Sequence, residues 1–217
     1  MGTDSDIQAL YPSRSGAGAQ LGGQLNRHTS PPTAVIGVTP SGVEVAANAA
    51  KAMGSKFDVI VAAHVRMEGL GIIGAVAEDG DAVLDPDFNP RFGVMDALNE
   101  AIDKARRAIK TERLLFRGQR PLISVEVMNV IVVDGHLTSP WKVLAAAEAL
   151  KSMSPLSIMI GSPVGTQAVQ NRVRARRLEF VCPSVVLDPS GHPKPFGDPQ
   201  DPSAERLRSI VVAREAA

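Results

Sequence analysis

The chain has 217 residues, and its 23 basic side chains balance 23 acidic ones to a formal net charge of +0. This length suits one globular domain with a small appendage, and the charge balance gives no global attraction to nucleic acid or to a membrane surface. A single cysteine, Cys182, excludes an internal disulfide and a thiol-only metal cage. No apolar run approaches the roughly 20 residues of a membrane span. We therefore expect a cytoplasmic protein without membrane or nucleic-acid partners.

Composition divides the chain into three parts. Residues 1–32 are rich in Gly, Ser, Gln and Pro, which predicts an N-terminal arm that is flexible or drapes over the domain, and in which Leu21 and Leu25 could form one helical turn. Residues 33–188 are expected to form the main domain. Residues 189–217 are expected to form a Pro-rich tail with a short C-terminal helix.

Between these boundaries, short apolar runs alternate with amphipathic segments. We expect strands at residues 34–38, 57–63, 130–133, 156–160, 178–181 and 185–187, and helices at residues 43–53, 95–116, 140–153, 166–177 and 205–214. A β-hairpin is expected over residues 73–84, because Asp79-Gly80 is a strong hairpin turn. Strands that alternate with helices predict an α/β fold with a doubly wound, mostly parallel sheet, flanking helices and a small β-hairpin/helix insertion.

The segment of residues 130–150 is the most informative. A buried strand at 130–133 is followed by Asp134, a short polar loop and an Ala-rich helix from about Pro140. Ligands of open α/β sheets bind at the carboxyl ends of strands, and a helix that begins there suits a phosphate group. The segment therefore predicts a site for a phosphorylated ligand beside a carboxylate. The alternative is that Asp134 only caps the turn.

A second loop follows the first strand. Gly37 and Gly42 have the spacing of a P-loop, but Val43-Glu44 follows in place of the lysine and hydroxyl residue, which argues against nucleotide hydrolysis. Residues 39–42 either bind an anion through backbone amides or form an ordinary turn with Ser41 as helix cap. The sequence leaves both interpretations open.

The order of residues 130–142 resembles the phosphoribosyl-pyrophosphate (PRPP) signature of type I phosphoribosyltransferases, in which four apolar residues, two acids and a small-residue loop precede a helix. Residues 34–46, 57–78 and 114–121 resemble a poorly characterised bacterial branch of these proteins. The resemblance covers roughly residues 34–182. It implies the phosphoribosyltransferase-like fold of the type I family and a transferase, specifically a glycosyltransferase, of nucleotide metabolism.

The resemblance also implies roles for individual residues. Asp134 would be the catalytic residue and hold a ribose hydroxyl, and Mg²⁺ would arrive with PRPP rather than in a protein cage. The ribose-5-phosphate loop would consist of Asp134, Gly135, His136, Leu137, Thr138, Ser139 and Lys142. The pyrophosphate loop would consist of Thr39, Pro40, Ser41 and Gly42, and the acceptor pocket of Arg66, Trp141 and Val164. Trp141 would either stack on a base or plug the site.

Four positions depart from the family pattern. Gly135 replaces the second acid, Pro140 replaces the glycine of the phosphate turn, Lys142 replaces a small hydroxyl residue, and Ser41 replaces an arginine. Proline has no N–H to donate, and lysine supplies charge with less geometric control. We therefore expect binding of PRPP or a nucleotide with catalysis weakened or retargeted. The alternative is a non-catalytic nucleotide sensor or protein-interaction module of the same fold. Whether the chain is an enzyme, and whether it forms a homodimer, stays open.

Overall fold

The computed structural model describes residues 9–89, 94–187, 194–198 and 202–215. Its centre is a five-stranded sheet with the order β10-β8-β6-β1-β2, in which every pair of neighbours is parallel. The strands are β1 (Thr33–Val38), β2 (Lys56–Ile60), β6 (Asn129–Val133), β8 (Ser157–Gly161) and β10 (Glu179–Val181). All of β1 is buried, because helices cover both faces of the sheet. The predicted α/β fold with a mostly parallel sheet is confirmed.

Each face of the sheet has its own hydrophobic core. On one face, α1 (Arg14–Leu25) and α2 (Gly42–Met53) pack against Val35, Ile131 and Val133. On the other face, α4 (Trp141–Lys151) and α5 (Gln167–Ala175) pack with Ile36 and Val132. Successive side chains of β1 and β6 thus point alternately into the two hydrophobic cores, one on each face of the sheet.

Of the two expectations for the N-terminal arm, helix α1 shows residues 14–25 packed on the domain rather than flexible, and residues 1–8 lie outside the described residues. Leu21 and Leu25 are fully buried against α2. A Cβ at Gly18 would lie 2.4 Å from the carbonyl oxygen of Val45, so glycine lets the two helix backbones approach closely. The glycines that suggested mobility are therefore used for packing.

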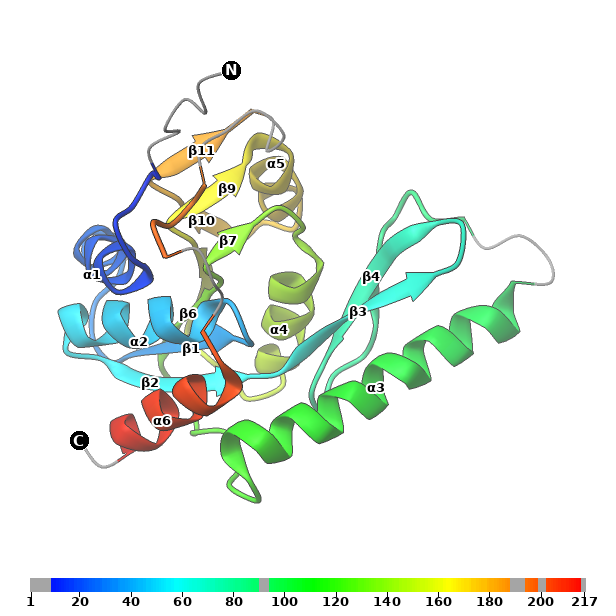
Figure 1. Cartoon of the computed structure of the whole chain (residues 1–217), viewed down its shortest axis with the longest axis horizontal. Coiled ribbons are helices and arrows are strands. Elements are labelled where there is room, and N and C mark those ends of the chain that lie inside the picture. Colours follow the sequence, from blue (N-terminus) through cyan, green and yellow to red (C-terminus); the bar gives the residue numbers. More distant parts are fainter. Residues whose placement is uncertain (1–8, 90–93, 188–193, 199–201, 216–217) are drawn as a thin grey trace, which may run out of the picture.

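An elongated lobe extends from the sheet, on the right in Figure 1. It consists of β3 (Ala62–Met67), β4 (Gly71–Ala77) and β5 (Val83–Leu84), which form an antiparallel sheet, and of α3 (Met95–Arg117). We call this unit the hairpin lobe. The expected hairpin is confirmed by the β4–β5 pair. The strand expected at 57–63 is instead divided into β2 and β3, and β3 pairs with β4 across a turn.

A third sheet continues the chain beyond the carboxyl ends of the parallel strands. Its order is β11-β9-β7, with β7 (His136–Leu137), β9 (Val164–Thr166) and β11 (Ser184–Val186) in parallel pairs. The sequence analysis missed β7 and β9, which have only two and three residues. This sheet fixes the backbone that follows Asp134.

The C-terminal helix α6 (Ala204–Glu215) confirms the expected last helix and packs on α2 and α3. Residues 189–193, 199–201 and 216–217 of the expected Pro-rich tail lie outside the described residues, as does residue 188, so the domain boundary at 188 stays a prediction. Among the helices that the structure describes, none has the length and apolar character to cross a membrane.

Candidate functional site

Asp134 lies directly after β6 and is 3% exposed. Its Oδ1 accepts a hydrogen bond from the Gly135 N–H at 2.6 Å and another from the Ser41 hydroxyl. Oδ2 accepts none from the part of the chain that the structure describes. The carboxylate thus joins the loop after β1 (residues 39–42, the β1 loop) to the loop after β6 (residues 134–140, the β6 loop), with one oxygen left for a ligand.

The two loops are in backbone contact. A Cβ at Gly135 would lie 2.4 Å from the Ser41 carbonyl oxygen, and a Cβ at Gly42 would lie 2.2 Å from the Val133 carbonyl oxygen. Neither separation is compatible with a side chain at these positions. With the β1 loop in this position, the β6 loop therefore has no space for a side chain at residue 135, where the family signature has an acid.

Lys142, in the first turn of α4, reaches across to the β1 loop. Its Nζ donates to the Thr39 carbonyl oxygen at 3.0 Å. Glu112 of α3 also faces this point: burial raises the pKa of its carboxyl group, while the Thr39 hydroxyl and the Lys142 ammonium oppose that shift. The Thr39 hydroxyl and the Glu112 carboxyl group do not reach hydrogen-bonding geometry, because Thr39 Oγ1 has no hydrogen-bond partner among the described residues. The Glu112 carboxyl group thus lies near Lys142 and the β1 loop, without an ion pair to Lys142 among the described residues.

His64 of β3 borders the same region. Burial, then the charges of Lys142 and Arg66, lower its pKa to about 4, and Asp134 acts in the opposite direction. Its Nε2 is buried and has no hydrogen-bond partner among the described residues. His64 is therefore a neutral imidazole at pH 7, with one ring nitrogen available to a ligand. Arg66 itself is exposed.

The other residues predicted for the ribose-phosphate loop differ in burial and in hydrogen bonding. Leu137 is 1% exposed and belongs to the core, so only its backbone faces the loop. His136 is half-buried, and burial lowers its pKa against the opposing charge of Asp134. The Ser139 hydroxyl is buried without a described partner, and Thr138 lies between it and β7. Pro140 precedes α4 and makes no side-chain cap.

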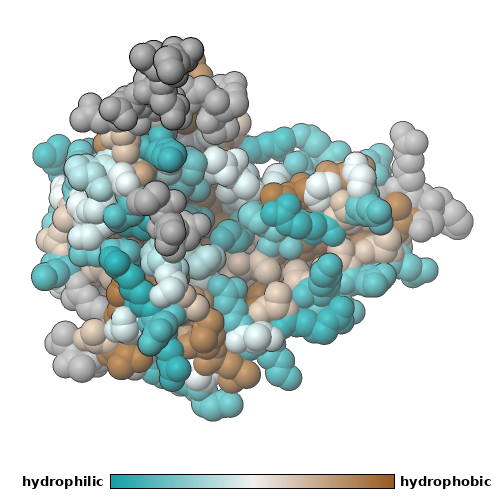
Figure 2. Space-filling model, in the orientation of Figure 1, coloured by the Kyte–Doolittle hydropathy of each residue, from teal (hydrophilic) through white to brown (hydrophobic). Residues whose placement is uncertain are grey.

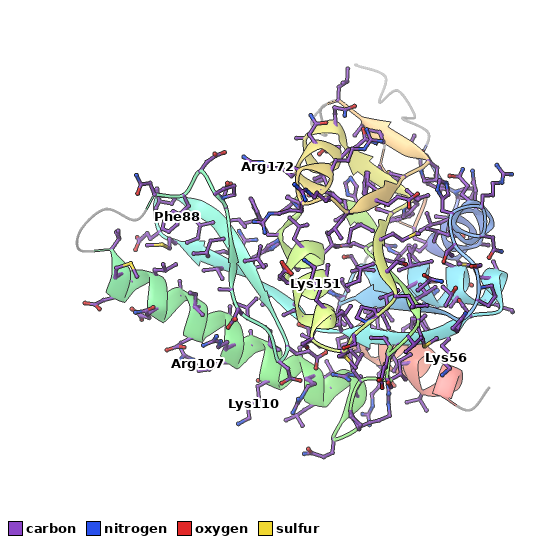
Figure 3. All side chains as sticks on the ribbon, turned by 180° about the vertical axis from the view of Figure 1, so that it is seen from behind. Lys56, Phe88, Arg107, Lys110, Lys151 and Arg172 are labelled. Atoms are coloured by element: carbon purple, nitrogen blue, oxygen red, sulfur yellow. The ribbon has the colours of Figure 1, made fainter. Side chains whose placement is uncertain are left out.

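Two residues predicted for the acceptor pocket are buried. Trp141 is 6% exposed, belongs to the core and carries the Arg172 guanidinium over its ring at 5.9 Å from the centroid. Figure 3 labels Arg172 on α5, and its guanidinium also pairs with Asp85 and Asp87 of the hairpin lobe. Val164 is 2% exposed in β9. The burial of Trp141 favours the interpretation that its side chain fills the site over the interpretation that it stacks on a base.

Comparison with known proteins gives related sequences and folds. No family model matches the chain. Two curated proteins from strains of Mycobacterium tuberculosis, each named "Putative phosphoribosyl transferase", are 26% identical over 180 residues, which cover 80% of this chain and 40% of each relative. The chain thus spans less than half the length of these relatives.

Three solved structures share the architecture at low identity. The crystal structure of TT1426 from Thermus thermophilus matches with a TM-score of 0.78 and 24% identity, over 94% of this chain and 98% of that one. A hypoxanthine phosphoribosyltransferase from Staphylococcus aureus matches with a TM-score of 0.51 and 13% identity, over 86% and 84%. The chain has a type I phosphoribosyltransferase-like fold. A hypothetical protein from Neisseria gonorrhoeae with bound ppGpp has a TM-score of 0.50 and 10% identity, over 95% and 97%.

Within this phosphoribosyltransferase-like fold, the predicted β1-loop and β6-loop residues come together at the carboxyl ends of β1 and β6. Ser41 donates to Asp134 and Lys142 donates to the Thr39 carbonyl oxygen of the same β1 loop. Trp141 and Val164, in contrast, belong to the packed interior. Sequence reasoning missed Glu112 and His64 as members. Nothing in the helical pattern around Glu112 indicates that the last turns of α3 approach the β1 loop.

The neutral state of His64 makes the stability of this phosphoribosyltransferase-like domain depend on pH. Between pH 6.5 and pH 4 the unfolded chain binds a proton at His64 that the folded chain does not, so the free energy of unfolding falls as pH decreases through this window. We expect wild type to lose about 1 kcal/mol more stability than His64→Gln between pH 7 and pH 5, allowing for partial exposure. Urea unfolding at both pH values measures this difference.

The comparison variant for that experiment is His28→Gln, because the His28 side chain is 43% exposed and pairs with Glu179 at the surface, with 2.6 Å between Nδ1 and Oε1, so it reports a histidine that is not buried. Other groups with shifted pKa values, such as Glu78, titrate equally in wild type and variants and cancel from the comparison. Equal pH dependence in wild type and His64→Gln would contradict the prediction.

Proposed function

We propose that the chain binds a ribose-phosphate ligand, PRPP or a nucleotide, at the β6 loop after Val133, and that its transferase chemistry is weakened or retargeted. The observation that carries this proposal is the buried Asp134 carboxylate, which lies at the carboxyl end of β6 between the β1 loop and the start of α4. That position is the ligand site of open α/β sheets. The mycobacterial relatives, named as phosphoribosyl transferases, support the same class of ligand.

Each part of the ligand has a matching group in the proposed complex. Oδ2 of Asp134 accepts a hydrogen bond from a ribose hydroxyl. The backbone of Thr138 and Ser139, with the positive end of α4 and the Lys142 ammonium, holds the 5′-phosphate. The β1 loop faces the pyrophosphate. His64 Nε2 and the Ser139 hydroxyl, both buried without described partners, gain partners from the ligand or its water shell.

Several features of the site support weakened chemistry. One carboxylate instead of two holds the ribose, because Gly135 has no space for a side chain. Lys142 is already engaged by the Thr39 carbonyl oxygen, and the Glu112 carboxyl group, whose pKa is raised by burial, lies near the proposed pyrophosphate position. An incoming diphosphate would have to displace the Glu112 side chain or keep it protonated. This requirement reduces the affinity of the site for the diphosphate.

If transfer is retained, the bond between ribose C1 and a pyrophosphate oxygen breaks while a nitrogen of the acceptor bonds to C1. The described residues contain no group of three His, Cys, Asp or Glu side chains that would hold a metal ion. Mg²⁺ commonly binds one or two carboxylates together with substrate phosphates. Asp134 fits that pattern, so it would be the protein contribution to an ion that neutralises the diphosphate.

The second candidate function is a non-catalytic sensor or protein-interaction module. Figure 2 shows hydrophobic surface, in brown, where α6 and the C-terminal end of α3 meet, and Leu114, Leu115 and Val212 of these helices are exposed. Exposed apolar patches mark interaction surfaces. This observation favours a protein partner or a second copy of the chain, and light scattering of the purified protein would show the latter directly.

Calorimetric titration with PRPP and Mg²⁺ tests the proposal, with ribose 5-phosphate and AMP as comparison ligands. We expect at least one of the three to bind in the micromolar range. A product assay with PRPP and a panel of bases then separates the two candidates. Ribosylation at an enzyme-like rate would exclude the sensor, and absence of binding by all three ligands would overturn the proposed function.

A further inference from the structure

A second hollow lies in the hairpin lobe, between α3 and the end of β4. It has a volume of about 430 Å³, within the range of roughly 300 to 1,000 Å³ that small-molecule sites occupy. Its floor is apolar: Val76, Ala77 and Ile109 line it, and each is at most 5% exposed. The residues that line this hollow do not include those of the Asp134 site.

Three cations line the α3 side of this hollow. Arg106, Lys110 and Arg113 stand at positions i, i+4 and i+7 of the helix, together with the floor residue Ile109 at i+3. This spacing places all four on one helix face. The hollow therefore combines an apolar floor with a basic rim, whereas a merely solvated helix face has no such floor.

Few carboxylates balance these cations. Glu78 lines the hollow, but its carboxylate pairs with Arg117, and both side chains are at most 4% exposed. Asp79 lies 3.8 Å from Arg113 and is 85% exposed, which makes a weak surface pair. Among the described ion pairs, none involves Arg106 or Lys110. The rim thus has a surplus of positive charge.

We propose that this hollow is a second ligand site, which binds a phosphorylated small molecule with a ring, of the size of a mononucleotide. Arginine and lysine hold phosphate through charge-assisted hydrogen bonds, and the fork of an arginine can bind it with two parallel N–H groups. The ring lies on the apolar floor beside Ile109. The charge of the rim selects the phosphate, and the floor selects a ligand larger than free phosphate.

Nuclear magnetic resonance titration of the full chain tests this proposal. AMP is the probe, and adenosine and inorganic phosphate are its comparisons. The chain carries Asp134→Asn throughout, which removes the charge at the first site. We expect AMP to shift the backbone signals of residues 76–80 and 106–113 with saturation. Adenosine and phosphate should each bind at least tenfold more weakly.

Two variants and one matched control decide the outcome. Arg106→Gln and Arg113→Gln should each weaken AMP binding about tenfold. Arg107→Gln removes the same charge one residue along α3, where Figure 3 labels Arg107, and should change the affinity less than twofold. Unshifted signals at the hollow, equal binding of phosphate and AMP, or an equal loss in Arg107→Gln would each overturn the proposal.

Discussion

Replacement of Asp134 by asparagine is expected to weaken binding of PRPP or AMP by about 10- to 100-fold, which corresponds to the loss of one hydrogen bond to a charged group. The amide oxygen of asparagine can still accept from the Ser41 hydroxyl and the Gly135 N–H, as Oδ1 does in wild type. Thermal unfolding should therefore change little. Calorimetric titration and a melting curve on the same preparations measure both quantities.

Two further variants separate function from structure in that experiment. Asp134→Ala should weaken binding to the same extent but also lower the stability by about 1 kcal/mol, because the buried Gly135 N–H loses its acceptor. Glu126→Gln removes an equal charge from an exposed turn away from both proposed sites and should leave both quantities unchanged. Wild-type affinity in Asp134→Asn would show that the carboxylate does not contact the ligand.

The parallel sheet could be predicted because its strands are continuous apolar runs. The runs at β1 and β6 are buried on both faces, and such strands are typical of sheets covered by helices on each side. Strand β7 could not be predicted, since two residues carry no periodicity. Its position depends on pairing with β9, which is a tertiary property.

Glycine was the least reliable signal in the sequence. In α1, Gly18 and Gly22 suggested flexibility, yet both lie where α2 approaches too closely for a side chain. The helix expected over residues 43–53 does end there, because Gly54 has φ of +62° and terminates α2. The difference is that a helix end is a local property of the backbone, whereas a close approach depends on a segment elsewhere in the chain.

The candidate site shows the same difference between features that are local in the sequence and features that depend on distant segments. The position of Asp134 follows from the strand, loop and helix pattern around it, and that pattern is local. Glu112 and His64 reach the site from the hairpin lobe, so the fold must be known before they can be placed there. Both are ionisable groups close to Lys142. The charge balance of the site is therefore set by the lobe as much as by the two loops.

Restoring the second acid of the family signature by Gly135→Asp is expected to destabilise the chain by about 1–3 kcal/mol, the usual effect of an added side chain in a packed site. It is not expected to restore transfer. A Cβ at this position would lie 2.4 Å from the Ser41 carbonyl oxygen, so the β1 loop must move away and the hydrogen bond between Ser41 and Asp134 is lost. Urea unfolding and PRPP titration measure the two effects.

Two glycine variants identify the cause of that loss. Gly135→Ala adds the Cβ without the charge and should lose nearly as much stability as Gly135→Asp, if steric overlap is the reason. Gly23→Ala in α1 adds a Cβ where nothing lies within 4 Å and should be neutral or slightly stabilising. A stable Gly135→Asp with higher PRPP affinity would show instead that the β1 loop yields to the acid. The missing carboxylate alone would then account for the weakened site, and the contact between the two loops would be a consequence of its loss.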